Sequence, residues 1–259
     1  MSGVIYCLPG SPRSSLFPQL IKYTGLDIEV KDPSAACFAE NFPLKKCPAY
    51  KQNDGFKLTE TLAILKYLVD QVPGKYNWFG KTKQEEAKVW QWLSFVNSDY
   101  VSALCDWALP SFGVLPYDKQ RIERGVASLD KLTSLLEDQL HKTKYLAGDE
   151  ATLADIYAIQ AVKVCYGSLW EESWVKEHPA VARWVQQLKE DPTRRSAEFV
   201  KPAKPDSPVV DLNSTNVDLA APHSSPARAI DAVFGNSHFL QLDMHNPGFG
   251  KFVADASLG

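Results

Sequence analysis

The chain has 259 residues, with 28 basic and 31 acidic side chains and a formal net charge of −3. This length suits one large domain or two modest ones, and the lack of an overall positive charge argues against nucleic acid or an anionic membrane as a partner. Hydrophobic residues make up 45% of the chain, which is enough for a packed core.

Cysteine usage and the N-terminal residues point to the cytoplasm. The five cysteines form an odd set without a CxxC pair, which favours reduced thiols over a disulfide framework. The first ten residues have no basic leader and break their apolar run at Pro9-Gly10, unlike a signal peptide. The most apolar window, Leu153 to Trp170, contains Asp155 and Lys163 and falls short of a membrane span. We therefore expect a soluble cytoplasmic protein.

Strand and helix signals alternate over roughly the first 75 residues. In chain order, the patterns predict a strand at 4–8, a helix from 14, a strand at 27–31, strands at 48–51 and 55–58, and a helix at 59–69. Asp54-Gly55 supplies the turn chemistry of a hairpin between the last two strands. The order βαβ followed by ββα predicts a thioredoxin-like α/β domain over residues 1–78.

Long helical periods replace the strand signals from Thr82 onward. Apolar residues at helical spacing run through 89–100 and 122–140, on either side of a proline- and glycine-rich break. Thr152 and Asp155 match a capping box, and the helix after them is apolar nearly all round, so it should lie in the middle of a bundle. These patterns predict an all-α C-terminal helix bundle over residues 84–192.

A proline-bearing tail is predicted for residues 201–259. Its segment Ala229 to Leu242 is apolar enough to dock as a short helix, and disorder is the alternative. Tail histidines are usually solvated, so no metal site is predicted at His238, Asp243 and His245. The chain also lacks the GxxxxGK, HExxH and GxSxG patterns and zinc-spaced cysteine pairs, which leaves kinase, hydrolase and structural-metal functions without a starting residue set.

Several motifs resemble those of cytosolic glutathione transferases. They are Lys45 to Ala49, Leu58 to Ile64, Tyr145 to Gly148 and Thr152 to Asp155. The resemblance spans about residues 3–192 and implies the glutathione transferase fold. Three further segments most resemble the transferase-like region of the gamma subunit of translation elongation factor one B, namely Asn41 to Lys46, Trp92 to Asp99 and His178 to Trp184.

The resemblance leaves two functions of different class. The gamma subunit continues into a lysine-rich linker and a second domain, whereas this sequence ends in the proline-bearing tail, which favours a stand-alone fungal biosynthetic-pathway transferase. Such an enzyme uses glutathione on a small-molecule electrophile, either by conjugation or by thiol-assisted cis-trans isomerisation of an activated olefin in secondary metabolism. The alternative is a non-catalytic, elongation-factor-like scaffold that binds a partner protein. A homodimer is also implied by the family.

The resemblance places glutathione, the implied cofactor, around Cys47 and Pro48. An X-Pro bond adopts the cis form far more readily than other peptides, and a cis bond here would turn the Cys47 backbone toward an extended tripeptide. Glu60 and Thr61 match the family's acid-hydroxyl pair, which holds the γ-glutamyl group at a helix start; simple capping is the alternative. One lysine of the Lys45-Lys46 pair would bind the glycyl carboxylate.

Three residues are candidates to activate the glutathione thiol. Ser11 matches the serine of serine-type transferases and ranks first, although it can instead be a helix N-cap with Pro12 at the first helical position. Arg13 matches an arginine in the gamma-subunit pattern and ranks second, as a cationic partner, and Ser14 ranks third. Lowering a thiol pKa by about 2 units takes about 2.7 kcal/mol, which one or two hydrogen bonds to the thiolate can supply.

A pocket for the electrophile is predicted between the domains. Four residues cluster around the break after the first long helix and would line it: Cys105, Trp107, Phe112 and Tyr117. Aromatic residues at such spacing are more often core packing than pocket. The identity of the electrophile does not follow from these side chains.

Overall fold

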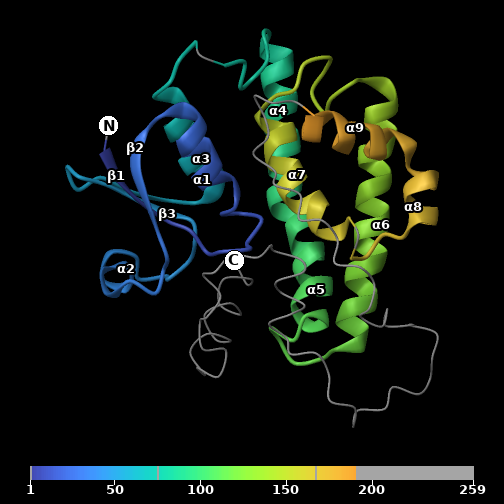
Figure 1. Cartoon of the computed structure of the whole chain (residues 1–259), viewed down its shortest axis with the longest axis horizontal. Coiled ribbons are helices and arrows are strands. Elements are labelled where there is room, and N and C mark those ends of the chain that lie inside the picture. The colour runs from blue at the N-terminus through green and yellow to red at the C-terminus, as the bar shows by residue number, and fades with distance from the viewer. Residues whose placement is uncertain (1, 75, 167, 191–259) are drawn as a thin grey trace.

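The computed structural model describes residues 2–74, 76–166 and 168–190, which form an α/β unit followed by a group of helices (Figure 1). The predicted tail over 201–259, the short helix considered at Ala229 to Leu242, and the metal-ligand candidates His238, Asp243 and His245 lie outside the described residues. Within the described part of the chain, no helix is long and apolar enough to cross a membrane.

The α/β unit is built on a four-stranded sheet with the order β2-β1-β3-β4. The strands are β1 (Ser2–Tyr6), β2 (Asp27–Lys31), β3 (Ala49–Gln52) and β4 (Lys57–Thr59). β1 pairs in parallel with β2 and antiparallel with β3, and β4 returns along β3 after a turn at Gly55, whose φ of 98° favours glycine. The predicted βαβ and ββα order is confirmed.

Both faces of the sheet are covered by helices. These helices are α1 (Leu16–Thr24), α2 (Ala36–Asn41) and α3 (Thr61–Asp70). Successive side chains of a strand point to opposite faces, so Ile5 of β1 joins the core that contains α1 and α3, whereas Tyr6 packs against Phe38 and Phe42 on the α2 side. The sequence pattern does not predict α2, because six residues are too few to show a helical period.

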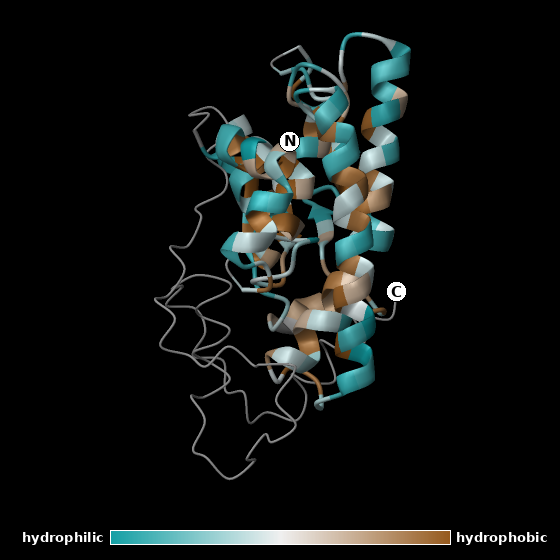
Figure 2. Cartoon of the chain, turned by 90° about the vertical axis from the view of Figure 1, so that its right-hand side faces the viewer, coloured by the Kyte–Doolittle hydropathy of each residue, from teal (hydrophilic) through white to brown (hydrophobic). Residues whose placement is uncertain are grey.

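The helical unit begins with one continuous helix whose winding changes midway. α4 (Lys83–Phe95) runs into a π-helical turn, η1 (Val96–Tyr100), and then into α5 (Val101–Ser111). The remaining helices are α6 (Lys119–Lys142), α7 (Leu153–Cys165), α8 (Glu172–Glu177) and α9 (Pro179–Glu190). Hydrophilic and hydrophobic residues share the surface of these helices, as expected for elements that cover a core (Figure 2). The all-α second half is therefore confirmed.

α7 is the central helix of the bundle, as predicted from its apolar residues. Nearly all of its side chains are buried. Its start is closed by the predicted capping box of Thr152 and Asp155. The buried Asp155 carboxylate accepts hydrogen bonds at 2.9 Å from the N–H groups of Leu146 and Thr152 and from the indole N–H of Trp184.

α5 and α6 approach each other closely at Gly125. A Cβ atom at this position would lie 2.5 Å from the backbone nitrogen of Trp107 and 3.0 Å from the carbonyl oxygen of Ala103, so a larger residue would force the helices apart. The Trp107 side chain is buried and packs edge-on against Phe112, with ring centroids 5.5 Å apart. These two aromatic residues therefore belong to helix packing.

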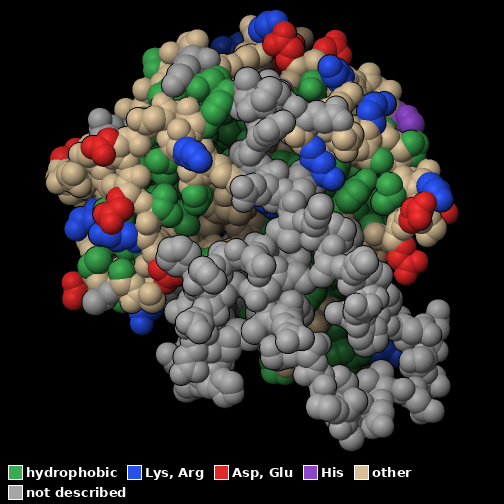
Figure 3. Space-filling model, viewed as in Figure 1, with side chains coloured by type: hydrophobic (Ala, Val, Ile, Leu, Met, Phe, Trp, Pro, Cys, Tyr) green, Lys and Arg blue, Asp and Glu red, His purple; other side chains and the backbone are tan. Residues whose placement is uncertain are grey.

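Side-chain hydrogen bonds connect the α/β unit with the bundle. The Ser15 hydroxyl donates to Oε1 of Gln160 at 3.3 Å, and Nη2 of Arg13 donates to the carbonyl oxygen of Asn97 at 3.0 Å. α1 lies beside α7 at this boundary (Figure 1). Acidic and basic side chains are mixed over the described part of the surface in Figure 3, in keeping with the small net charge.

Candidate functional site

A cavity of about 290 Å³ lies where the loop before β3, the start of α3 and the π-helical turn meet. Its lining comes from the loop Asn41 to Pro48 without Lys45, from the junction Lys57 to Thr61, and from Arg13 and Asn97. The predicted site residues that line it are Arg13, Lys46, Cys47, Pro48, Glu60 and Thr61. Residues from three separate parts of the sequence therefore meet in one place.

The Cys47–Pro48 peptide is cis, as predicted. Burial raises the pKa of the Cys47 thiol to about 12, and the negative charge of Asp32 adds to this effect. The thiol is therefore neutral at physiological pH and a poor nucleophile, because the thiolate is the reactive form. What Cys47 offers a ligand in the cavity is its backbone.

The start of α3 has no side-chain cap. Glu60 holds the N-cap position with φ 70° and ψ 121°, and its side chain makes no capping hydrogen bond. A positive φ is rare for a residue other than glycine and is often found at functional sites. The first N–H groups of a helix have no partner within the helix and carry its positive end. Glu60 and the buried Thr61 thus place the backbone N–H groups of this helix start at the cavity.

Basic side chains outnumber acidic ones in the lining of the cavity. Arg13, Lys46 and Lys57 line it, and Glu60 is the acidic residue among them. Lys45 does not line the cavity: it is exposed, in a turn with φ 51°. Such a lining suits a ligand with more carboxylates than amines. The sequence analysis did not single out Lys57.

The turn between β1 and α1 brings Arg13 to the cavity but leaves the other two predicted thiol activators, Ser11 and Ser14, outside its lining. α1 begins at Leu16, so the alternative role of Ser11 as its N-cap is wrong. The Ser11 carbonyl oxygen instead accepts hydrogen bonds from the N–H groups of Ser14 and Ser15, each at 2.9 Å. These bonds form a turn before the helix, so both N–H groups already have a partner. Neither Ser11 nor Ser14 lines the cavity, and the buried Ser14 hydroxyl has no hydrogen-bond partner in the described structure.

Arg13 reaches the cavity from this turn. Its guanidinium is held by the Asn97 carbonyl oxygen of the π-helical turn. Burial raises the pKa values of Cys105 and Tyr157, and the positive charge of Arg13 opposes both increases. The guanidinium therefore lies at the boundary between the two units with its charge directed toward buried groups of the bundle.

Asn97 is a lining residue that sequence reasoning did not identify. Its Oδ1 atom accepts a hydrogen bond at 2.8 Å from the hydroxyl of Tyr157, on α7. π-helical turns within α-helices are frequent at functional sites, but such a turn leaves no mark in apolar spacing. Asn97 belongs to the segment Trp92 to Asp99, which the sequence analysis noted for its resemblance only.

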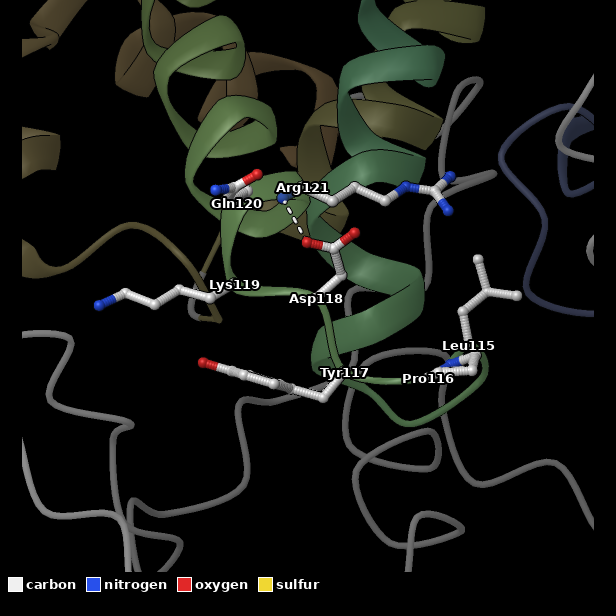
Figure 4. A pocket seen from close by; sticks show the side chains of 7 residues that line it. All are labelled: Leu115, Pro116, Tyr117, Asp118, Lys119, Gln120 and Arg121. Carbon is white, nitrogen blue, oxygen red and sulfur yellow. Dashed lines mark hydrogen bonds between the residues drawn. The ribbon is translucent and has the colours of Figure 1, made fainter.

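None of the four residues predicted to line an acceptor pocket belongs to the lining of the cavity beside Pro48. Trp107 is part of the buried core, and Phe112 packs against that core with its ring centroid 5.5 Å from that of Trp107. Cys105 is half-buried near Arg13, and Tyr117 is exposed. Tyr117 lines a separate hollow of about 530 Å³, formed by the consecutive residues 115–121 (Figure 4).

Comparison with known proteins places both halves of the chain in one family. The family model described as "Glutathione S-transferase, N-terminal domain" matches residues 1–70, and the one described as "Glutathione S-transferase, C-terminal domain" matches residues 90–192. A solved glutathione S-transferase from Pichia kudriavzevii is 34% identical, with a TM-score of 0.61 over 72% of this chain and 91% of that chain.

Relatives of known sequence fall into two groups. Elongation factor 1-gamma 1 of Saccharomyces cerevisiae is 33% identical over 67% of this chain, and the match spans only 43% of that protein's length. Glutathione S-transferase psoE of Aspergillus fumigatus is 29% identical over 73% of this chain and 81% of its own length. With both domain models matched in order on the expected fold, the chain belongs to the glutathione S-transferase family.

Proposed function

We propose that the protein is a cytoplasmic, glutathione-dependent enzyme that acts on an electrophilic small molecule. The observation that carries the proposal is the start of α3. It has no side-chain cap at Glu60 and opens into a cavity that also contains the cis Cys47–Pro48 peptide. A helix N-terminus with unused N–H groups favours an anionic ligand.

Each charged group of glutathione has a partner in the cavity under this proposal. The γ-glutamyl carboxylate binds the first N–H groups of α3 and the Thr61 hydroxyl, and its amine donates to Glu60. The Cys47 backbone pairs with the cysteinyl residue as an added strand would. The glycyl carboxylate binds Lys46, which is favoured over Lys45 because Lys45 does not line the cavity.

Arg13 is the favoured partner of the thiolate. Its guanidinium lies in the cavity and is held by Asn97, whereas Ser11 lies outside the lining. A nearby cation stabilises a thiolate relative to the thiol and so lowers the thiol pKa. This reverses the order of the sequence-based ranking, which placed Ser11 first.

The ionised sulfur then attacks the electrophile. In conjugation, a carbon–sulfur bond forms while a leaving group departs with its electron pair, or an activated olefin takes up the thiolate and then a proton. In isomerisation, the thiolate adds to the olefin, the former double bond rotates, and elimination returns the thiolate. The proposal includes both reactions, a role in secondary metabolism and a homodimeric state.

The similarity to elongation factor 1-gamma supports a second candidate, a non-catalytic scaffold that binds a partner protein. The two candidates differ in what the cavity does. An enzyme must bind glutathione and ionise its thiol, whereas a scaffold can retain the shape of the cavity without either property.

Calorimetric titration with glutathione tests the proposal. We expect saturable binding by the unaltered protein and about 10-fold weaker binding by Thr61→Val, because a hydrogen bond to a charged group is lost. Thr61→Ser is the matched control and should bind nearly as well as the unaltered protein, because it keeps the hydroxyl. No binding by the unaltered protein would sink the enzymatic proposal and favour the scaffold.

Turnover of an aromatic halide with glutathione tests the assignment of the thiolate partner. Arg13→Ala should lower the rate and raise the pH at which the rate reaches half its maximum, whereas Ser11→Ala should leave both unchanged. If Ser11→Ala lowers the rate and Arg13→Ala does not, Ser11 and not Arg13 stabilises the thiolate.

A further inference from the structure

The π-helical turn contributes one residue, Asn97, to a cavity whose other lining residues come from the α/β unit. The carbonyl oxygen of Asn97 holds Arg13, and its side-chain Oδ1 is held by the Tyr157 hydroxyl at 2.8 Å. The amide nitrogen Nδ2 has no hydrogen-bond partner among the residues that the structure describes. Since Tyr157 occupies the oxygen end of the amide, the donor end of Asn97 is the one left for a ligand.

Tyr157 also connects Asn97 with the start of α3. It is buried on α7. Burial raises the pKa of its hydroxyl, and the positive charge of Arg13 and the neighbouring Thr61 side chain oppose that rise. A single buried hydroxyl therefore lies next to the groups proposed for the thiolate and for the γ-glutamyl carboxylate. Asn97 is hydrogen-bonded to both Arg13 and Tyr157 and lines the same cavity as Thr61.

We propose that Asn97 is a further binding residue, whose Nδ2 donates to the γ-glutamyl carboxylate of bound glutathione, and that Tyr157 is the positioning residue that fixes the orientation of its amide. This inference rests on the proposed function. It makes the bundle, and not only the thioredoxin-like unit, responsible for recognising glutathione. Bound glutathione would then contact the α/β unit and the bundle at the same time and connect them.

Two variants test the assignment. Asn97→Asp keeps an oxygen for Tyr157 but replaces the donor with a second acceptor, so glutathione should bind at least about 10-fold more weakly. Tyr157→Phe keeps the ring and frees the amide, so a loss of about 3- to 10-fold is expected. Tyr100→Phe is the matched control, because it removes a buried hydroxyl from the same π-helical turn, bonded to Thr133 at 3.0 Å and away from the cavity.

Fragments of glutathione show which end of the ligand is affected. The losses should be equally large for γ-glutamylcysteine, which keeps the γ-glutamyl group, and absent for cysteinylglycine, which lacks it. Tyr100→Phe should change the melting temperature but none of these affinities. A general loss of packing would instead affect the two fragments alike.

The outcomes separate this inference from the function on which it rests. If the unaltered protein does not bind glutathione, both are overturned. If it binds, and Thr61→Val weakens binding while Asn97→Asp and Tyr157→Phe do not, the proposed function stands and this inference is overturned. Unchanged or tighter binding by Asn97→Asp, or an equal loss for cysteinylglycine, would also overturn it.

Discussion

α3 and α7 begin in opposite ways. At the start of α7, the Asp155 carboxylate is buried and accepts hydrogen bonds from two backbone N–H groups, the Trp184 indole and the Thr152 hydroxyl. At the start of α3, Glu60 is exposed, has a positive φ, and provides no cap. The protein's own atoms close one terminus, and the other is left open to a cavity.

The contrast separates stability from binding. Unsatisfied N–H groups at a helix start cost stability unless side chains, water or a ligand satisfy them. A terminus buried in the bundle has no access to solvent and must be closed by the chain itself. A terminus at a cavity can remain open for a ligand, so under the proposed function the uncapped start of α3 serves binding, whereas the cap at α7 serves stability.

The largest expected effect on stability comes from removing the Asp155 cap at the start of α7. Asp155→Ala would leave the buried indole N–H of Trp184 and two backbone N–H groups without an acceptor, so we expect a loss of at least about 3 kcal/mol in the free energy of unfolding. Urea titration measures it. Asp149→Ala changes an exposed aspartate in the preceding loop and should cost less than about 0.5 kcal/mol. Equal losses would show that the buried acceptor is not what stabilises α7.

A smaller effect is expected near the other end of α7. Burial lowers the pKa of Lys163 from 10.5 to about 8, and its amine donates to Oε1 of Gln160 at 2.8 Å. Between these two pH values the unfolded chain keeps a proton on Lys163 that the folded chain has released, so the contribution of Lys163 to stability should rise with pH across this window. Below about pH 8 Lys163 is protonated in the folded chain as well, so burial of its charge lowers the free energy of unfolding by the full amount.

Lys163→Met should remove that pH dependence and stabilise the protein at pH 7 by about 1 to 3 kcal/mol. Denaturant titrations at pH 7 and pH 10 compare it with Lys131→Met, an exposed change on α6 that should leave the slope with pH intact. A steep rise in stability that persists in Lys163→Met would assign the effect to another group.

The smallest stability effect is expected at the open terminus, where binding should change instead. Glu60→Gly suits a positive φ, so unfolding should cost the same or up to about 1 kcal/mol more, while glutathione affinity falls because the partner of the amine is gone. Lys45→Gly is the matched control, since Lys45 also has a positive φ but lies outside the cavity. A marked loss of stability in Glu60→Gly would contradict the idea that this backbone is strained in favour of a ligand.

Much of the fold was predictable because its signals are local. The strand at 27–31, the turn at Gly55 and the Thr152–Asp155 box each depend on residues close in sequence, and each is found as predicted. The short α2 and the π-helical turn were missed for the same reason. One is too short to show a period, and the other is a change of winding that leaves apolar spacing almost intact.

The candidate site was only partly predictable. Motifs drew attention to the Lys46–Pro48 loop and to Glu60 and Thr61, and these residues do line one cavity. The aromatic residues near the α5–α6 loop were expected at a pocket, but Trp107 is buried where Gly125 lets two helices meet. Residue type alone does not distinguish an aromatic ring in a core from one that lines a pocket.

By itself, the sequence determined the order of the strands and the longer helices, the family and the helix that lies at the centre of the bundle, because periodicity and capping act over a few residues. Tertiary structure alone decided that Arg13 and not Ser11 lines the cavity, and that Asn97 joins it from the bundle. These placements depend on hydrogen bonds between residues that are far apart in the chain, and no local pattern encodes such contacts.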